Sequence, residues 1–325
     1  MERYLVTGSS GHLGEALVRT LRERGEDVVG LDVLDAPFTT VTGSVTDRDT
    51  VRRALDGVTR VLHAATLHKP HVISHARQDF VDTNVTGTLA VLEEAAAAGV
   101  ESVVFTSSTS AFGRALTPAP GEPAAWITED VRPVVRNIYG ATKIAAEDLC
   151  ELAARDLRLP VVVLRTSRFF PEPDDRDDVR AGYHDTNLKV NEFLYRRVDL
   201  ADVVDAHLLA ARRAPELGFD RFVISATTPF TPDDLGELAV DAPAVFGRLF
   251  PDIAADYERW GWRMLPSLDR VYVNDRARRV LGWRPRYDFR AVAELVRAGG
   301  APRSPLAQAV GAKGYHAEPT GVYTR

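Results

Sequence analysis

The chain of 325 residues is 45% hydrophobic and 26% charged, with a formal net charge of −6, and this composition is typical of globular proteins. A nucleic-acid partner would require clustered excess Lys and Arg, so none is expected. No apolar stretch approaches the roughly 18 residues of a membrane span, and no signal-peptide pattern precedes the first predicted strand, so we expect a cytoplasmic protein with no membrane partner. Cys150 is the only cysteine, which excludes an intrachain disulfide and a cysteine-based zinc site.

The first predicted strand, residues 4–7, leads into three glycines at three-residue spacing, after which an apolar helical pattern begins. Glycine permits a positive φ and close backbone approach, and a helix start presents unpaired N–H groups and a positive dipole end to an anion. A glycine turn that binds nothing is the alternative, which the flanking strand and helix disfavour. We predict a turn that binds a dinucleotide pyrophosphate, formed by Gly8, Ser10, Gly11, His12, Leu13 and Gly14.

The second predicted strand, residues 28–32, ends at Asp32. This carboxylate stands close to the spacing of about 20 residues expected for the acid that binds a ribose 2′-hydroxyl. A 2′-phosphate would face the carboxylate, and neither Val33 nor Leu34 supplies a positive charge. The sequence therefore favours NAD over NADP, although an acid at the end of a strand can also be an ordinary polar terminus.

Further strands are predicted at residues 61–64, 103–106 and 161–164, with helical patterns between them. Regular alternation of strands and helices predicts an α/β protein with a Rossmann-type, doubly wound parallel sheet. Right-handed crossovers bring the carboxyl ends of the strands to one edge, where ligands bind. We expect the chemistry of this protein at that edge.

After Pro171 the chain is acidic and interrupted by proline, and residues 172–178 are expected to form a solvated loop. Helical patterns follow at 201–213, 275–281 and 290–297, with a strand at 222–225 and a helix start for which Thr231 is the N-cap. We expect a dinucleotide-binding domain over 1–167 to which 197–226 return, a smaller interwoven substrate-binding part formed by 168–196 and 227–300, and a tail without clear periodicity over 301–325.

Two residues on one predicted helix face suggest acid–base chemistry. Tyr139 and Lys143 are four residues apart and therefore about one turn apart. An ammonium near a phenol favours the ionised phenol and is expected to lower the tyrosine pKa from about 10. Ser108 ends the strand at 103–106 with a hydroxyl that can bond a reacting oxygen, although hydroxyls at strand ends are often only turn groups. Together the three side chains predict proton transfer coupled to hydride transfer.

At this point the chain resembles the extended short-chain dehydrogenase/reductase family, whose sugar-nucleotide epimerases and dehydratases carry Thr-Gly-x-x-Gly-x-x-Gly and a Ser/Thr and Tyr-x-x-x-Lys triad. The resemblance covers roughly residues 1–290. Similar segments are His63-Ala64-Ala65, Asn84-Val85-Thr86-Gly87-Thr88, Thr106-Ser107-Ser108, Phe112-Gly113 and Leu281-Gly282-Trp283-Arg284-Pro285.

The resemblance implies that Ser108, Tyr139 and Lys143 are the catalytic triad and that Lys143 also bonds the nicotinamide ribose. It further implies NAD contacts beyond the glycine turn and Asp32, at Ser44, Val45, His63, Ala64, Ala65, Asn84, Thr106 and Thr166. A homodimer is implied as well, through the helix after Asn84 and the helix of Tyr139. The apolar residues Leu89, Leu92, Leu149 and Leu152 suit that contact or packing within the chain.

Several departures from the family pattern concern the ligands. Ser44 stands where the family has the Asp that approaches the adenine, and it is a weaker partner. Arg168 stands where sugar-nucleotide enzymes have a substrate-contacting Asn, and a fixed guanidinium suits a carboxylate or phosphate. An ion pair with the acidic run 174–178 is the structural alternative. The segment 168–202 is also short, and the phosphate-binding Arg of the family aligns nearer Tyr195 than Arg196 or Arg197, so a compact substrate is expected.

Three histidines, His68, His71 and His75, lie close together, but Pro70 interrupts the local helix and no acid lies between them. We expect no metal site there, and expect these imidazoles to lie in or near the cleft. The residues expected to bind substrate are Ser108, Thr109, Tyr139, Arg168, His68 and Lys69.

These features predict an NAD-dependent enzyme that moves hydride at a secondary hydroxyl or ketone of a sugar or sugar-like substrate, with Tyr139 as acid and base. An epimerase would retain NAD, whereas a dehydrogenase of a small non-nucleotide substrate, such as a sugar acid, polyol or hydroxy ketone, would release NADH. The triad is common to both. A non-catalytic NAD sensor is disfavoured because Tyr139 and Lys143 are both present, and dehydration is disfavoured because Thr109-Ser110 replaces the Asp-Glu pair of dehydratases.

Overall fold

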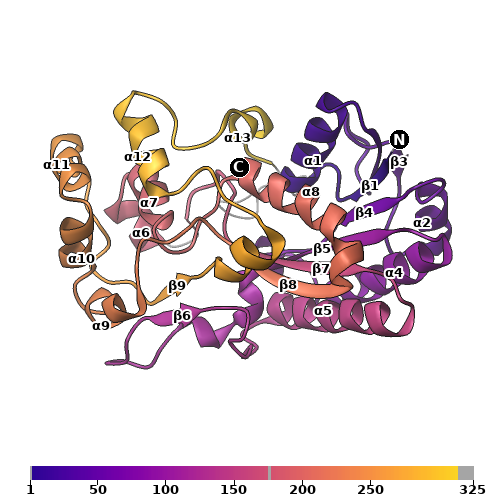
Figure 1. The fold of residues 1–325 in the computed structure, drawn as a ribbon, viewed down its shortest axis with the longest axis horizontal. Helices are drawn as coiled ribbons and strands as arrows, with labels where there is room; N and C mark the ends of the chain where they lie inside the picture. Colours follow the sequence, from indigo (N-terminus) through magenta and orange to yellow (C-terminus); the bar gives the residue numbers. More distant parts are fainter. Residues whose placement is uncertain (1, 175–176, 314–325) are drawn as a thin grey trace.

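The computed structural model describes residues 2–174 and 177–313 and has a seven-stranded parallel sheet at its centre, in the order β3-β2-β1-β4-β5-β7-β8 (Figure 1). The predicted α/β fold is therefore confirmed, and the reversal of strand order between β1 and β4 creates the crevice expected of a doubly wound sheet. The strands are β1 (Arg3–Thr7), β2 (Asp27–Asp32), β3 (Val41–Thr42), β4 (Arg60–His63), β5 (Ser102–Ser108), β7 (Val161–Thr166) and β8 (Phe219–Ile224).

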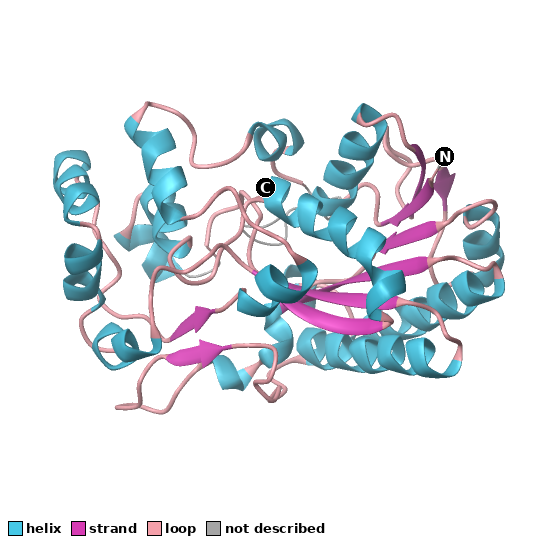
Figure 2. Ribbon diagram, in the orientation of Figure 1, coloured by secondary structure: helices cyan, strands magenta, loops and turns pink. Residues whose placement is uncertain are grey.

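The central strands form because their side chains are apolar on both faces, the pattern expected of a parallel sheet covered by helices. Val104 and Val162 pack under α1 (His12–Glu23) and α8 (Leu200–Leu217). Val103 and Val163 point to the opposite face, against α2 (Arg48–Ala54), α4 (Gly87–Ala97) and α5 (Ile138–Asp156). Figure 2 shows the strands between these two helical layers.

A second, smaller part lies beyond the carboxyl edge of the sheet, on the left of Figure 1. It contains a two-stranded parallel sheet of β6 (Ala125–Ile127) and β9 (Arg270–Tyr272). The sequence placed residues 125–127 in the dinucleotide-binding domain, but they pair with β9 here. The helices that surround its core, or connect to it, are α7 (Asp185–Glu192), α9 (Leu235–Leu238), α10 (Ala242–Leu249), α11 (Pro251–Trp260) and α12 (Phe289–Arg297).

Shorter elements complete the described chain. They are α3 (Arg77–Val81), α6 (Asp177–Gly182), 3-10 turns at Lys69–Ile73, Thr109–Phe112, Arg114–Leu116 and Pro232–Asp234, and π-helical turns at Asp82–Thr86 and Ala277–Leu281. As predicted, Thr231 stands at the N-cap position of the turn that begins at Pro232. Among the helices described, none is long and apolar enough to cross a membrane.

The tail contains a helix that the sequence did not reveal, α13 (Pro305–Val310). The Ser304 hydroxyl caps it by accepting the N–H of Ala307 at 3.1 Å. Ala307 and Val310 join the core cluster of α1 and α8. A helix of six residues is too short to show a clear apolar period, so packing against these helices, not local sequence, stabilises it. Residues 314–325 of the predicted tail lie outside the described residues.

Two fully buried histidines are held in the neutral form. The Nδ1 of His207 lies 2.8 Å from the Val203 carbonyl oxygen, so Nδ1 carries the proton and Nε2 accepts from Thr106 Oγ1 at 2.8 Å. Burial lowers the pKa of His207 to about 4, and burial with the nearby charge of Lys143 lowers the pKa of His63 to about 3. In the unfolded chain both imidazoles return to a pKa of about 6.5.

We expect the protein to lose stability as the pH falls below about 6.5, because the unfolded state then binds protons that the folded state cannot accept. Each histidine contributes up to about 1.4 kcal/mol per pH unit between its two pKa values. In urea unfolding at several pH values from 4.5 to 6.5, His207→Gln should reduce the pH slope by roughly one such contribution. An unchanged slope would show that His207 is protonated in the folded state.

Candidate active site

A cleft of about 840 Å³ opens at the carboxyl edge of the sheet, at the ends of β1, β2, β4, β5 and β7. Residues of the second part and of the tail close its other side. The cleft brings together most of the predicted site, namely Gly8, Ser10, Gly11, His12, Leu13, Gly14, Asp32, Ser44, Val45, Ala64, Ala65, His68, Lys69, Thr106, Ser108, Thr109, Tyr139, Lys143, Thr166 and Arg168.

The glycine turn leaves no room for side chains at two of its three glycines. Gly8 has φ +72, and a Cβ there would lie 2.8 Å from the backbone nitrogen of Ala65. A Cβ on Gly14 would lie 1.9 Å from the carbonyl oxygen of Gly8. Gly11 is the N-cap of α1 and has no side chain to bond the helix N–H groups. Those donors face the cleft in a bare backbone cradle, which fits a dinucleotide pyrophosphate.

Asp32 joins the end of β2 to this turn. One carboxylate oxygen accepts the N–H of Ser10 at 2.9 Å, and the other accepts the N–H of Leu34 at 3.0 Å. These bonds hold the carboxylate at the cleft wall, where a ribose would bind. The neighbouring Val33 is 65% exposed and Leu34 is 55% exposed. Apolar groups at this point of the wall suit a 2′-hydroxyl and offer no partner to a 2′-phosphate.

His63 and Asn84, both predicted to contact NAD, do not line the cleft. The ring of His63 lies between two hydroxyls, with Nδ1 2.7 Å from Thr7 and Nε2 3.0 Å from Thr88. Asn84, in the π-helical turn, accepts the N–H of Leu67 at 2.8 Å and donates to Thr142 at 3.0 Å. Both side chains are buried and bond groups next to the cleft, so the structure gives them a supporting place, and direct contact with NAD stays a prediction.

Ser108 and Tyr139 meet at the end of β5. The helix α5 begins one residue before Tyr139, and the Asn137 side chain caps it by accepting the N–H of Gly140 at 2.9 Å. The Ser108 hydroxyl lies near the Tyr139 phenol, close enough for hydrogen bonding to lower the pKa of the phenol. Burial raises the pKa of Tyr139 to about 12, against the opposing effect of the Ser108 hydrogen bond. The predicted lowering of this pKa by Lys143 is wrong, because burial raises the pKa and Lys143 is not among the groups that shift it.

Lys143 lies one turn further along α5 and points to the strand instead of to the phenol. Its Nζ donates to the carbonyl oxygen of Thr106 at 2.8 Å and lies 4.6 Å from the centre of the Phe105 ring. Burial lowers the pKa of Lys143 to about 7, although Glu147 acts in the opposite direction. At neutral pH the Lys143 side chain is therefore present in both its charged and its uncharged form.

A buried ion pair lies beneath this helix. Arg165, near the end of β7, forms bidentate bonds to Glu147, with Nη2 to Oε2 at 2.7 Å, and the Ser107 hydroxyl donates to Glu147 at 2.5 Å. Both charged side chains are almost fully buried. Because each partner would be left as an unpaired buried charge without the other, the pair fixes α5 against the ends of β5 and β7.

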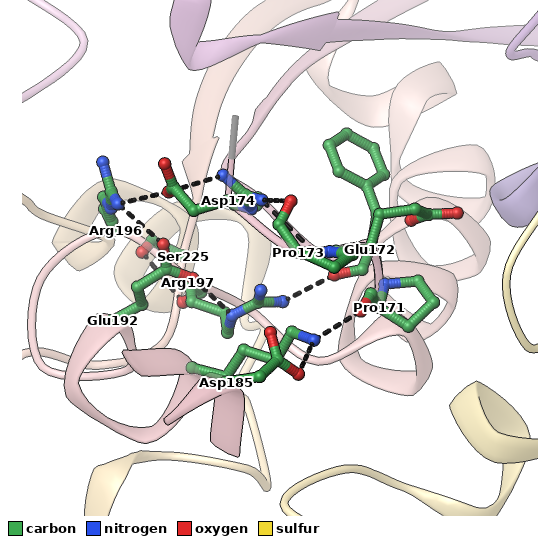
Figure 3. Close-up of polar contacts among 12 residues, drawn as sticks. Pro171, Glu172, Pro173, Asp174, Asp185, Glu192, Arg196, Arg197 and Ser225 are labelled. Atoms are coloured by element: carbon green, nitrogen blue, oxygen red, sulfur yellow. Dashed lines mark hydrogen bonds and ion pairs between the residues drawn. The ribbon is translucent and has the colours of Figure 1, made fainter. Parts of the chain in front are cut away.

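Arg168 has the structural role that the sequence left as an alternative. Its Nη1 pairs with Asp174 at 3.2 Å, and its Nη2 bonds the carbonyl oxygen of Pro173 at 3.0 Å. Asp174 also pairs with Arg196 Nη2, at 3.3 Å (Figure 3). Asp174 and Glu172 are 4% and 2% exposed, so the expectation of a solvated acidic loop is wrong for these two residues. Basic side chains, among them Arg196 of the second part, hold the loop that contains Asp174 in the interior.

The sequence did not identify the basic residues that the second part adds to the wall of the cleft. Arg270 and Tyr272 come from β9, whose position depends on pairing with β6, and Arg196 follows α7. Arg197, by contrast, is buried in a pair with Glu192 at 2.8 Å. Among the described lining residues one carboxylate, that of Asp32, faces seven cationic side chains, Lys69, Arg136, Lys143, Arg168, Arg196, Arg270 and Lys313. The cleft thus favours anions in an acidic protein.

The three clustered histidines all line the cleft. The rings of His68 and His71 meet edge to face at 4.6 Å, and His71 accepts the backbone N–H of His68 at 2.9 Å. Within the described part of the chain, no group of three or more His, Cys, Asp or Glu side chains is arranged to hold a metal ion.

A glycine cradle, an acid at the end of β2 and a Ser-Tyr-Lys set on a doubly wound sheet are features of the short-chain dehydrogenase/reductase type. Residues 4–224 match the model of the NAD dependent epimerase/dehydratase family, and the chain belongs to this family. The prediction that its cofactor is NAD is confirmed by this membership.

Relatives with different activities are similar to this chain. A UDP-glucose 4-epimerase from Streptomyces lividans is 28% identical, covering 66% of this chain and 72% of the relative. A 3-beta-hydroxysteroid dehydrogenase from Mycolicibacterium neoaurum is 25% identical over 90% of both. Sterol demethylase protein B from Methylococcus capsulatus is 37% identical, but the match covers 49% of each chain, so this chain spans about half the length of that relative.

Solved structures share the fold. A short-chain dehydrogenase/reductase superfamily protein from Agrobacterium tumefaciens with bound NAD has a TM-score of 0.64 and 24% identity, covering 92% of this chain and 98% of the other. A UDP-N-acetylglucosamine 4-epimerase from Bacillus cereus has a TM-score of 0.62 and 16% identity, with the same coverage.

Proposed function

We propose that the protein transfers hydride between NAD and a secondary hydroxyl or ketone of a sugar-like substrate, with Tyr139 as the general acid and base. The observation that supports this most strongly is that Ser108, Tyr139 and Lys143 line the same cleft as the glycine turn. Hydride transfer to a ketone requires a proton donor at the ketone oxygen, and the Tyr139 phenol is suited to that role. The direct test is Tyr139→Phe, which should remove turnover and leave NAD affinity unchanged.

The residues of the chain account for the proton transfer. When bound, NAD supplies the acceptor or donor of the hydride. With its pKa raised to about 12, Tyr139 is protonated at neutral pH and can donate to a ketone oxygen that becomes negative as hydride arrives. In the reverse direction the Ser108 hydrogen bond stabilises the phenolate that takes the hydroxyl proton.

The same groups serve two outcomes. An epimerase would keep the cofactor bound and return the hydride to the opposite face of the ketone, whereas a dehydrogenase would release NADH. Relatives of both kinds are similar to this chain.

A homodimer remains a further proposal. Leu92 is buried within the chain and is not available for its interface.

We further propose a compact, anionic substrate such as a sugar acid. Its carboxylate would be bound by Arg270 instead of by Arg168, the residue expected from the sequence. The Arg270 side chain lines the cleft and is 15% exposed. Its Nε forms an ion pair with Asp269 at 3.0 Å. Arg168, by contrast, is bonded to Asp174 and two carbonyl groups. A guanidinium fork binds a carboxylate with two parallel hydrogen bonds.

Arg270→Gln should raise the KM for a sugar acid by about tenfold, equivalent to 1.4 kcal/mol, with a smaller effect on kcat because the lost contact binds substrate and transition state alike. D-glucuronate and D-glucose are compared as substrates by NADH formation. The control is Arg155→Gln, because the Arg155 side chain lies on α5 and is 69% exposed. Equal activity on both sugars, or micromolar affinity for a UDP-sugar, would contradict the proposed substrate class.

A further inference from the structure

The end of the described chain returns to the helix that follows the glycine turn. The backbone N–H of Ser304 donates to Asp199 Oδ2 at 2.8 Å, which ties the tail to the start of α8. From there α13 packs against α1 and α8. This anchored helix brings Lys313, which is 141 residues beyond Glu172 in the sequence, to the wall of the cleft.

Lys313 contacts two acids that come from different parts of the chain. Its Nζ forms an ion pair with Glu15, in the first turn of α1. Its backbone N–H donates to Glu172 Oε1 at 3.1 Å. Glu172 also pairs with His12 Nε2 at 2.9 Å. Lys313 thus connects the glycine turn, the loop after β7 and the tail.

The Glu172 carboxylate is held almost fully buried behind the turn. The His12 and Glu172 side chains are 2% and 1% exposed. Burial alone would raise the pKa of Glu172, but the hydrogen bond and charge of His12, with the N–H of Lys313, keep it below its usual value. Its Oε2 has no hydrogen-bond partner within the described chain, so the few contacts at Oε1 hold the whole group.

Two carboxylates near the start of α1 oppose the binding of an anion there, because like charges repel strongly where water is scarce. Arg19 neutralises one oxygen of Glu15 at 2.7 Å, and Lys313 pairs with the other. Without Lys313, Glu15 would keep a single cationic partner and the cleft would lose a positive charge. The pyrophosphate of NAD would then bind beside a less compensated acid.

We infer that Lys313 is a positioning residue of the NAD site, which makes NAD affinity depend on the C-terminal segment. By compensating Glu15 and bonding Glu172, it stabilises the glycine turn in the arrangement that accepts the pyrophosphate. The linkage is reciprocal, so bound NAD must also stabilise the attachment of the tail.

NADH affinity, measured by fluorescence titration of the full-length protein, tests the inference without turnover. Lys313→Met keeps the backbone N–H and should raise the NADH Kd about tenfold, equivalent to 1.4 kcal/mol. Lys313→Arg should restore affinity. In a Glu15→Gln background, Lys313→Met should cost at most about twofold, because the carboxylate to be compensated is gone. Arg303→Met, an exposed cation of the same tail, is the matched control.

Amide hydrogen exchange gives a second measurement on the same variants. NADH should slow exchange in residues 305–313 of the wild type and should not do so in Lys313→Met. An unchanged Kd in Lys313→Met, or the same tenfold loss in the Glu15→Gln background, would overturn the inference. Because no step of the test involves catalysis, either result leaves the proposed hydride transfer to be judged separately.

Discussion

Replacing Tyr139 by Phe should lower kcat by on the order of 100-fold to 10,000-fold, the contribution typical of general acid–base catalysis. The substitution removes one hydroxyl from a buried side chain that lines the cleft, and the ring still fills its place. NADH affinity should therefore stay within about twofold of the wild type, since the glycine turn and Asp32 are untouched. Steady-state kinetics and fluorescence titration measure the two effects.

Tyr183→Phe is the matched control for this experiment. Its hydroxyl donates to the Met264 carbonyl oxygen at 3.5 Å in the second part and does not line the cleft. The same loss of one hydroxyl should leave kcat unchanged there. If Tyr139→Phe retained the full activity of the wild type, Tyr139 would not be the proton donor.

Gly14→Ala should remove NAD binding and destabilise the fold. The added Cβ would lie 1.9 Å from the Gly8 carbonyl oxygen and 2.8 Å from the Cα of Ser9, so the rigid backbone of the turn must move. Overpacking of this kind costs about 1–3 kcal/mol. A displacement of about 1 Å at a site that positions reactants costs activity on the order of 100-fold. Urea unfolding and NADH titration report the two losses.

Gly236→Ala, within α9, supplies the comparison, because a Cβ there meets nothing within 4 Å. In a helix, alanine in place of glycine should be neutral or stabilising by up to about 1 kcal/mol. Wild-type NADH affinity in Gly14→Ala would show that the turn does not bind the pyrophosphate.

The fold and the dinucleotide half of the cleft could be predicted because their signals are local. Backbone geometry requires glycine at Gly8 and Gly14, which lie within seven residues, and the strands are recognisable by their apolar composition. The acid at Asp32 and the spacing of Tyr139 and Lys143 are likewise readable along the chain. These features depend little on what the rest of the protein does.

The part of the cleft wall that comes from the second part and from Lys313 could not be predicted, because its position depends on tertiary contacts. Arg270 reaches the cleft only because β9 pairs with β6, and Lys313 only because α13 packs on α1 and α8. Arg168 was assigned to the substrate, but the loop that follows it folds back and binds its guanidinium. No spacing in the sequence relates these residues to one another.

The pKa of Tyr139 could not be predicted from the sequence either. The four-residue spacing to Lys143 suggested a lowered value, but spacing does not report burial or the direction of a side chain. The structure turns Lys143 Nζ toward the Thr106 carbonyl and buries the phenol, and burial has the larger effect. Tyr139 is therefore better prepared to donate a proton than to accept one.

Hydride transfer to NAD can be followed most directly by isotope transfer. The wild-type protein is incubated with NAD and sugar acids deuterated at their secondary carbinol carbons, and the recovered cofactor is analysed by mass spectrometry. One deuterium should appear on the nicotinamide with the wild type, and in the same time Tyr139→Phe should label roughly a hundredth as much cofactor or less. Conversion of the substrate by the wild type with no deuterium in the cofactor at any time would contradict the proposed function.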